Sequence, residues 1–311
     1  MSEFHHVSVL LQECLDGLHI KPDGIYVDGT LGGAGHSSEI AKRLTTGRLI
    51  GIDRDTTALT AAGKRLEAYK DRVTLVHSNF SRMKDVLEDL GISGVDGILL
   101  DLGVSSPQLD DGARGFSYMV DAPLDMRMNS EDTLSAYDVV NTWSYEELRR
   151  ILFDYGEERY APKIASAICK RREEKAIETT LELVDVIRGA MPAQALREKQ
   201  HPAKRSFQAI RIAVNDELGS VEKVMKDAVP CLNPGGRLAV ITFHSLEDRI
   251  VKTAMAGAAK GCTCPPSFPV CVCGKKPQVH VITHKPIIST DAELERNPRA
   301  RSAKLRVCEK A

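Results

Sequence analysis

Short apolar runs that end in polar residues alternate with longer amphipathic segments between Gly24 and Val104. The apolar runs predict strands at Gly24–Asp28, Arg48–Asp53, Val73–His77 and Gly97–Asp101. The segments between them have helical length and spacing, at His36–Leu44, Thr56–Tyr69 and Met83–Leu90. Because strands and helices alternate, we expect a parallel sheet with right-handed crossovers.

The pattern changes between about Leu109 and Arg205, where strand-like runs vanish. Helical spacing dominates there, at Ser144–Asp154, Ala161–Glu174 and Thr180–Ala190. After a helix near Ser206–Leu218, strand patterns return at Arg237–Phe243, Val279–Thr283 and Ala303–Cys308. We therefore predict an α/β domain formed by residues 1–108 and 206–311, closed by a terminal hairpin and interrupted by an all-helical insertion at 109–205.

Charge and hydropathy narrow the class of protein. The 311 residues include 42 Lys and Arg against 43 Asp and Glu, a formal net charge of -1. Nucleic acid would therefore have to be bound by local basic patches. The first twenty residues lack a basic segment followed by a long apolar one, and the chain has no apolar window of about 18 residues. These features predict a cytoplasmic protein without a membrane span.

A glycine-rich turn, Asp28–His36, follows the first predicted strand. Its glycines let the backbone approach a ligand closely and expose amide groups at the start of the next helix. The spacing is not Gly-x-Gly-x-x-Gly, which disfavours a dinucleotide. Asp28 precedes the glycines and suits a ligand with an ammonium group. The alternative is a tight turn without a ligand.

The other three strand ends carry further candidate ligand contacts. Asp53 is placed to accept hydrogen bonds from ribose hydroxyls; it could instead cap a helix, although Asp55 suits that role better. Phe80 could stack on adenine or simply belong to the core. Asp101 ends the fourth strand, near the expected reaction centre. Together these features indicate S-adenosylmethionine rather than NAD.

Long motifs along nearly the whole chain resemble the RsmH (MraW) family of bacterial 16S ribosomal RNA cytosine-N(4) methyltransferases. These motifs are His6–Leu11, Asp28–His36, Asp96–Asp111, Gly115–Met128, Tyr155–Ala165, His201–Leu218, Gly235–Asp248 and Asn297–Arg306. Ser8 departs from the Pro or Thr expected there, outside the pocket motifs.

The resemblance implies a class I, Rossmann-like methyltransferase sheet with an inserted helical substrate-recognition domain. The implied reaction is methylation of the exocyclic amine of a cytidine in the decoding region of the small ribosomal subunit. With the residues read from the strand ends and the glycine loop, the expected cofactor contacts are Asp28, Gly33, Ala34, Gly35, His36, Asp53, Phe80, Asp101 and Gln108. Among these, His36 and Gln108 rest on the resemblance alone.

The fourth strand is followed by Asp101-Leu-Gly-Val-Ser105 and not by the Asp/Asn/Ser-Pro-Pro-aromatic string of many amino methyltransferases. That motif therefore cannot be mapped onto this chain. We expect Asp101 or Ser105 to receive the amino protons. His244 is a third candidate because it follows a predicted strand at the same sheet edge; a histidine at such a position can equally be structural.

Two regions are candidates for RNA contact. One is the helix after Ser206, where a polar stripe could bind a base edge and a phosphate, or could belong to an ordinary surface helix. The other is the basic segment after Arg296, which could bind the RNA backbone or form a cationic edge strand. The candidate RNA-binding residues are Arg205, Gln208, Arg211, Asn215, Arg299 and Arg301.

Four of the eight cysteines form a Cys-x-Cys…Cys-x-Cys arrangement at Cys262, Cys264, Cys271 and Cys273. Four thiolates could bind zinc. However, Cys-x-Cys is less usual for structural zinc than Cys-x-x-Cys, so the pattern favours reduced thiols, and the active site is expected to need no metal.

Two other functions fit parts of the sequence. The first is an amino methyltransferase for DNA or protein, disfavoured by the missing Pro-Pro-aromatic string and the large helical insertion. The second is a cofactor-binding ribosome assembly factor in which methylation is incidental. The sequence indicates no oligomeric state.

Overall fold

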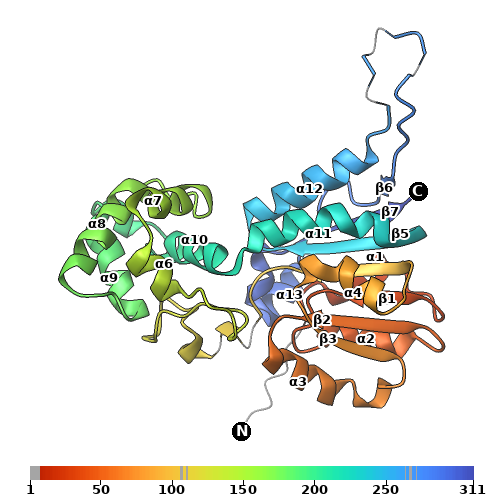
Figure 1. The fold of residues 1–311 in the computed structure, drawn as a ribbon, viewed down its shortest axis with the longest axis horizontal. Helices are drawn as coiled ribbons and strands as arrows, with labels where there is room; N and C mark the ends of the chain where they lie inside the picture. The colour runs from red at the N-terminus through yellow and green to blue at the C-terminus, as the bar shows by residue number, and fades with distance from the viewer. Residues whose placement is uncertain (1–7, 106–107, 110, 263, 266–267, 271) are drawn as a thin grey trace. The chain divides into compact units, whose positions relative to one another are not determined.

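The computed structural model describes residues 8–311 except 106–107, 110, 263, 266–267 and 271. Parts of the His6–Leu11 and Asp96–Asp111 motifs, and Cys271, therefore lie outside the described residues. The chain forms two compact units (Figure 1). Unit 1 comprises Met1–Gly103 and Leu218–Ala311, and unit 2 comprises Val104–Glu217.

Unit 1 contains a seven-stranded sheet in the order β3-β2-β1-β4-β5-β7-β6. Its strands are β1 Ile25–Asp28, β2 Arg48–Asp53, β3 Val73–His77, β4 Val95–Asp101, β5 Leu232–Thr242, β6 Val279–Val281 and β7 Lys304–Lys310. The first five strands are parallel, and β7 is antiparallel to both neighbours. The predicted class I, Rossmann-like sheet and its terminal hairpin are confirmed.

Helices cover both faces of this sheet because strand side chains alternate between two apolar clusters. In β4, Ile98 and Leu100 belong to the cluster that includes α4, α11 and α12, while Leu99 belongs to the cluster that includes α1, α2 and α3. The helices are α1 Leu11–Leu18, α2 Gly35–Arg43, α3 Thr56–Arg65, α4 Met83–Asp89, α11 Glu217–Cys231, α12 Ser245–Ala259 and α13 Asp291–Arg296.

One interpretation of the basic C-terminal segment is wrong. The structure places β7 between β5 and β6, so Ser302–Arg306 is not an edge strand. Arg306 is buried and pairs with Asp248, whose Oδ1 accepts from Nε at 2.7 Å. The Arg306 guanidinium is therefore stabilised within the sheet by an ion pair and not by water at a sheet edge.

Unit 2 is helical, as predicted. Its helices are α6 Ala136–Thr142, α7 Tyr145–Asp154, α8 Ala161–Glu174, α9 Thr180–Ala190 and α10 Lys204–Asn215. Capping boxes begin α6, α7 and α9, where Ser135, Ser144 and Thr179 each exchange hydrogen bonds with an acidic residue three positions later. A separate apolar cluster holds these helices together.

The structural division differs from the predicted domain limits, 108/109 and 205/206. Unit 2 begins at Val104 and ends at Glu217, so α10 belongs to it. The reason is that Phe207, Ile210 and Val214 of α10 are buried in the apolar cluster of unit 2. Among the described helices, none combines the length and apolar character needed to cross a membrane.

Candidate active site

The carboxyl ends of β1, β2 and β4 meet at one edge of the sheet, where Asp28 pairs in register with Gly51 on one side and Leu99 on the other. Hydrogen bonds tie the following loop to these strands. The Gly29 amide donates to the Leu99 carbonyl at 2.9 Å, and the Asp101 amide donates to Thr30 Oγ1 at 2.6 Å. The first glycine turn is thus fixed against the carboxyl end of β4.

The loop before α2 uses left-handed backbone at two positions, Gly32 (φ 49°) and Ala34 (φ 57°). At Gly29, a Cβ would lie 2.6 Å from Leu100 Cδ2, so any side chain there would require the buried Leu100 to move. At Gly33, by contrast, an added Cβ would meet no atom within 4 Å. This open space beside exposed backbone fits the close approach of a ligand.

Replacing Gly33 with alanine tests that open space. Since the new methyl group meets no protein atom, the melting temperature should stay unchanged. Cofactor affinity should fall about tenfold, or ~1.4 kcal/mol, if the methyl group occupies cofactor space. Titration calorimetry measures the affinity, and Gly257→Ala in α12, which also adds a Cβ in open space, is the matched control. Unchanged affinity in Gly33→Ala would place the cofactor elsewhere.

Asp28 is 1% exposed and organises the loop. Its Oδ2 accepts from Ser37 Oγ at 2.7 Å and its Oδ1 from the Thr30 amide at 3.2 Å. Burial raises the pKa of this carboxyl to about 6. These bonds join β1 to the first turn of α2, so the structure supports a loop-building role more directly than contact with a ligand ammonium.

Asp53 at the end of β2 holds the same loop from the other side. Its Oδ2 accepts from the Gly32 amide at 2.7 Å and its Oδ1 from the Asp55 amide at 2.9 Å. Asp55 caps α3 by accepting from the Thr57 amide, which confirms the capping role expected for it. Each Asp53 oxygen retains a lone pair, so the half-buried carboxylate could also accept hydrogen bonds from a ribose.

Asp101 differs from the other two aspartates in its hydrogen bonding. Its Oδ1 is shielded from solvent and has no hydrogen-bond partner among the described residues. Burial first, and then the negative charges of Asp28 and Glu247, raise its pKa to about 8. A carboxyl with this pKa is mostly protonated at neutral pH and becomes a proton acceptor as the pH approaches 8, and its unsatisfied buried oxygen can accept a hydrogen bond.

Two further predicted contacts lie at this edge. His36 is buried in the first turn of α2, with Nε2 3.0 Å from the Val9 carbonyl and Nδ1 3.8 Å from Asp101 Oδ2. The short Nε2 distance assigns the proton of a neutral ring to Nε2, so Nδ1 faces Asp101. Phe80 follows β3, is half-buried and packs against the core, with its Cβ 3.2 Å from the position of a Cβ on Gly29.

The other catalytic candidates are engaged in local structure. His244 is the N-cap of α12, where its ring accepts from the Glu247 amide and its Nε2 lies 3.1 Å from Glu247 Oε1. In unit 2, the Ser105 amide donates to Gln108 Oε1 at 3.2 Å. Gln108 is 6% exposed and also donates to the Met128 carbonyl at 3.4 Å. Gln108 therefore has a structural role, and His244 takes the structural role given as its alternative, although its buried Nε2 makes no hydrogen bond among the described residues.

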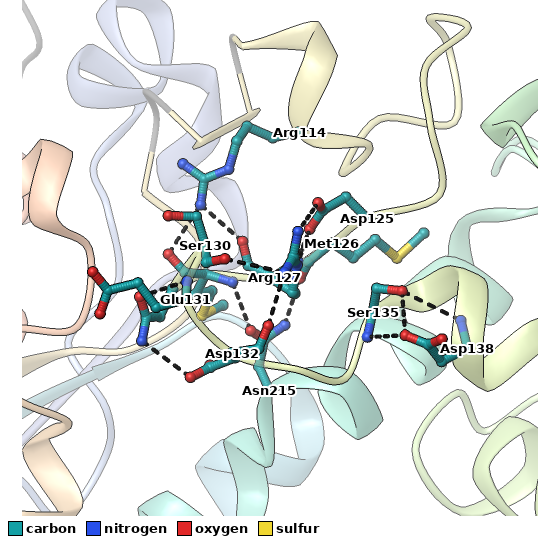
Figure 2. A network of polar contacts seen from close by, with 12 residues as sticks. Arg114, Asp125, Met126, Arg127, Ser130, Glu131, Asp132, Ser135, Asp138 and Asn215 are labelled. Atoms are coloured by element: carbon teal, nitrogen blue, oxygen red, sulfur yellow. Dashed lines mark hydrogen bonds and ion pairs between the residues drawn. The ribbon is translucent and has the colours of Figure 1, made fainter.

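A polar network shapes the Gly115–Met128 motif in unit 2 (Figure 2). Arg127 forms a two-point ion pair with Asp125, at 2.9 and 2.7 Å, and donates to the carbonyls of Ser130 and Asp132. Arg114 donates to the carbonyls of Arg127 and Met128. The Arg127 guanidinium lowers the pKa of Asp125 despite partial burial. These charges keep an irregular segment in one conformation.

Of the predicted polar stripe of α10, Asn215 joins this network. Asn215 is 2% exposed; its Oδ1 accepts from the Met128 amide and its Nδ2 donates to the Met126 carbonyl, both at 2.7 Å. Arg211 pairs with Glu217 at 2.8 and 2.9 Å, and Gln208 donates to the Tyr155 carbonyl. The RNA-contact interpretation of Asn215 is therefore replaced by a structural one: its amide is enclosed and bonded within unit 2.

Replacing Asn215 with alanine should destabilise unit 2 by about 2–4 kcal/mol, because a buried amide and a buried carbonyl lose their partner. Trp143, the single tryptophan of the chain, packs in the same unit, so its fluorescence during urea unfolding measures the effect. Gln208→Ala, which removes one half-buried hydrogen bond, is the control, with an expected loss of about 1 kcal/mol. If Asn215→Ala were as stable as the unmutated protein, Asn215 would again be a candidate for RNA contact.

The remaining RNA candidates are more accessible. Arg205 is half-buried at the start of α10, and its guanidinium lies 3.4 Å from the Glu157 carbonyl. Arg299 and Arg301 are exposed in a short 3-10 helix, Pro298–Ser302, between α13 and β7. Because they are exposed on unit 1, both side chains are accessible to a nucleic acid backbone.

The amino-acid sequence is similar to that of known proteins along nearly its whole length. A sequence model described as the MraW methylase family matches residues 3–311. The chain is 60% identical over 308 residues to "Ribosomal RNA small subunit methyltransferase H" of Brevibacillus brevis, covering 99% of this chain and 98% of the relative. Proteins of the same name from Clostridium botulinum (strain Kyoto) and Heliobacterium modesticaldum are 60% and 57% identical over 309 residues, covering 99% of both chains in each case.

Proposed function

The chain belongs to the MraW methylase family, and on that basis we propose that it methylates N(4) of a cytidine in the decoding region of 16S ribosomal RNA. It is a methyltransferase, and S-adenosylmethionine is its cofactor. The rRNA substrate is supported by three full-length relatives at 57–60% identity whose names specify the small ribosomal subunit. We infer that it acts in the cytoplasm, where small subunits are found.

The observation that carries the chemistry is the unsatisfied Oδ1 of Asp101 at the carboxyl edge of β4. When bound, S-adenosylmethionine supplies an electrophilic methyl group on a positively charged sulfur. Gly33, Ala34, Gly35, His36, Asp53 and Phe80 would hold the cofactor at this edge, and Asp28 would keep their loop in place. Gln108, in unit 2, stays a proposed contact.

Asp101 has a second task in this proposal. The lone pair of a cytosine amine is delocalised into the ring, so the amine becomes acidic only as its new bond to carbon forms. In its ionised form, which predominates above a pKa of about 8, Asp101 would accept a hydrogen bond from the amine and then its proton. Ser105 stays a second candidate to receive an amino proton, while His244 and Glu247 would keep the start of α12 in place. Positioning and charge would supply most of the rate.

We propose that Arg205, Arg299 and Arg301 bind RNA phosphates. Gln208 and Arg211 would contact RNA only if they exchanged their internal hydrogen bonds for bonds to the RNA. The cytidine would be splayed out of its stack because a paired amine is inaccessible.

The experiment is transfer of radiolabelled methyl groups to unmodified small subunits, naked 16S rRNA and DNA in parallel. We expect label on 16S rRNA, presented either within the small subunit or as naked RNA, and none on DNA. Label on DNA, or none on either RNA substrate while the protein binds the cofactor, would contradict the proposal. Asp101→Asn serves as the inactive control. If it still supported subunit assembly in cells, assembly would be separable from methylation.

A further inference from the structure

The cysteine-rich segment between α12 and β6 has an arrangement that the methyltransferase site does not explain. Its described residues form no helix or strand, and Figure 1 shows the segment projecting from the end of α12. In the described part, backbone hydrogen bonds close its base, where the Gln278 amide donates to the Ala258 carbonyl at 2.8 Å, and one turn, where the Phe268 amide donates to the Pro265 carbonyl at 3.0 Å. Something other than sheet or helix hydrogen bonding must therefore fix its conformation.

Apolar packing is also weak here. Phe268 is 50% exposed, Val270 70% and Val272 74%, so these side chains build no core around the segment. Segments that lack an apolar core are commonly held by a disulfide or a metal ion.

Three sulfur atoms gather inside this segment. The Sγ atoms of Cys262, Cys264 and Cys273 all lie within 4.8 Å of one another, although Cys273 is nine residues beyond Cys264 in sequence. Cys262 Sγ and Cys273 Sγ are 3.7 Å apart, far beyond the ~2.05 Å of a disulfide. In a tetrahedral zinc site with Zn–S bonds of ~2.3 Å, neighbouring sulfurs are separated by about 3.8 Å. The observed separation therefore matches an edge of a thiolate tetrahedron.

Backbone amides surround these sulfurs in the way that metal-bound thiolates require. The Cys264 amide donates to Cys262 Sγ and the Val272 amide donates to Cys264 Sγ, both at 3.4 Å. Such hydrogen bonds disperse the negative charge that collects when several thiols lose their protons to bind one cation.

We propose that Cys262, Cys264 and Cys273 bind a zinc ion that holds the segment between α12 and β6 in its folded form. Thiolate ligands favour soft or borderline cations over magnesium or calcium, and among these zinc is redox-inert and adopts the tetrahedral geometry that the sulfur separation matches. Each thiol releases its proton on binding. The sequence supplies a further thiol at Cys271, outside the described residues, and the proposal does not depend on it. The zinc is structural and separate from methyl transfer.

The test is titration of the reduced, metal-free full-length protein with zinc against a competing fluorescent chelator. We expect about one zinc per chain with a Kd below about 1 μM. Replacing Cys262, Cys264 and Cys273 together with serine should abolish this binding. Cys169→Ser in α8, a half-buried cysteine of unit 2, should retain it. Cofactor binding by both variants establishes that unit 1 is folded.

A second readout distinguishes zinc from a disulfide and applies to the unmutated protein. Zinc should slow proteolysis within residues 260–278 at least about tenfold, and chelation should reverse the effect. Cobalt should give the absorption of tetrahedral thiolate coordination. Failure of the reduced protein to compete for zinc, or zinc binding that survives the triple serine replacement, would overturn the proposal. A Cys262–Cys273 disulfide in freshly purified protein, together with no zinc binding once that disulfide has been reduced, would do the same.

Discussion

Asp101→Asn is expected to reduce the rate of methyl transfer by about 10²–10³-fold, the largest functional loss of any single substitution in unit 1. The amide keeps the size of the side chain and one acceptor oxygen, but it cannot take up the amino proton. Since the same residue is a proposed cofactor contact, cofactor affinity should also fall, though by less than the rate. Single-turnover kinetics at saturating cofactor separates the two effects.

The same substitution has a predicted effect on stability whose sign follows from the raised pKa. The folded protein binds a proton at Asp101 up to about pH 8, whereas an unfolded aspartate releases it near its ordinary value of 3.8. The unmutated protein therefore loses stability as pH rises between these values. Asp101→Asn should be similar in stability at pH 4 and more stable above pH 8. We expect a gain of about 2 kcal/mol, because a quarter of the side chain remains in water and screens its charge.

Thermal unfolding of the cofactor-free proteins at several pH values measures this difference. Asp96→Asn is the matched control, since Asp96 lies at the opposite end of the same strand and accepts from the Ile25 amide at 2.9 Å. A stability difference between Asp101→Asn and the unmutated protein that does not change with pH would show that Asp101 titrates like an ordinary surface carboxylate.

Asp53→Ala is expected to weaken cofactor binding about 100-fold, corresponding to ~2.7 kcal/mol. The substitution removes the proposed ribose acceptor and also releases the amides of Gly32 and Asp55, so the glycine loop loses one of its anchors. Equilibrium binding of S-adenosylmethionine, measured by calorimetry, tests this expectation.

Asp55→Ala controls for disturbance of α3. It removes the N-cap, which should lower the free energy of unfolding by about 1 kcal/mol while leaving the Asp53 carboxylate in place. If the two substitutions weakened cofactor binding equally, general loosening of the loop would explain the effect and Asp53 would lose its assignment.

Regular elements were predicted well where periodicity was strong. The limits of β2, β3, α8 and α9 agree with the sequence prediction, because an apolar run or an apolar stripe is a local property of the chain. No helix was predicted for α11 or α12. The position of β7 within the sheet depends on pairing with β5, whose residues are distant in sequence, so local patterns could not supply it.

The site was only partly predictable for the same reason. The end of β4 indicated Asp101 as a candidate near the reaction centre, but its raised pKa arises from burial first and then from the charges of Asp28 and Glu247, all of which depend on the fold. The polar stripe of α10 suggested exposure, whereas Asn215 binds backbone groups of Met126 and Met128, 87 to 89 positions away. A polar residue in a predicted helix can thus hydrogen-bond the backbone of a buried loop as readily as it can bind a ligand.

The most direct test of the central claim is mass spectrometric identification of the methylated nucleoside. Unmodified small subunits or their 16S rRNA would be incubated with this protein and isotopically labelled S-adenosylmethionine, and the RNA would be digested to nucleosides. We predict label in N(4)-methylcytidine at a single decoding-region position, and loss of that product with Asp101→Asn. Label in 5-methylcytidine, or in any nucleoside other than cytidine, would contradict the assignment of the reacting atom.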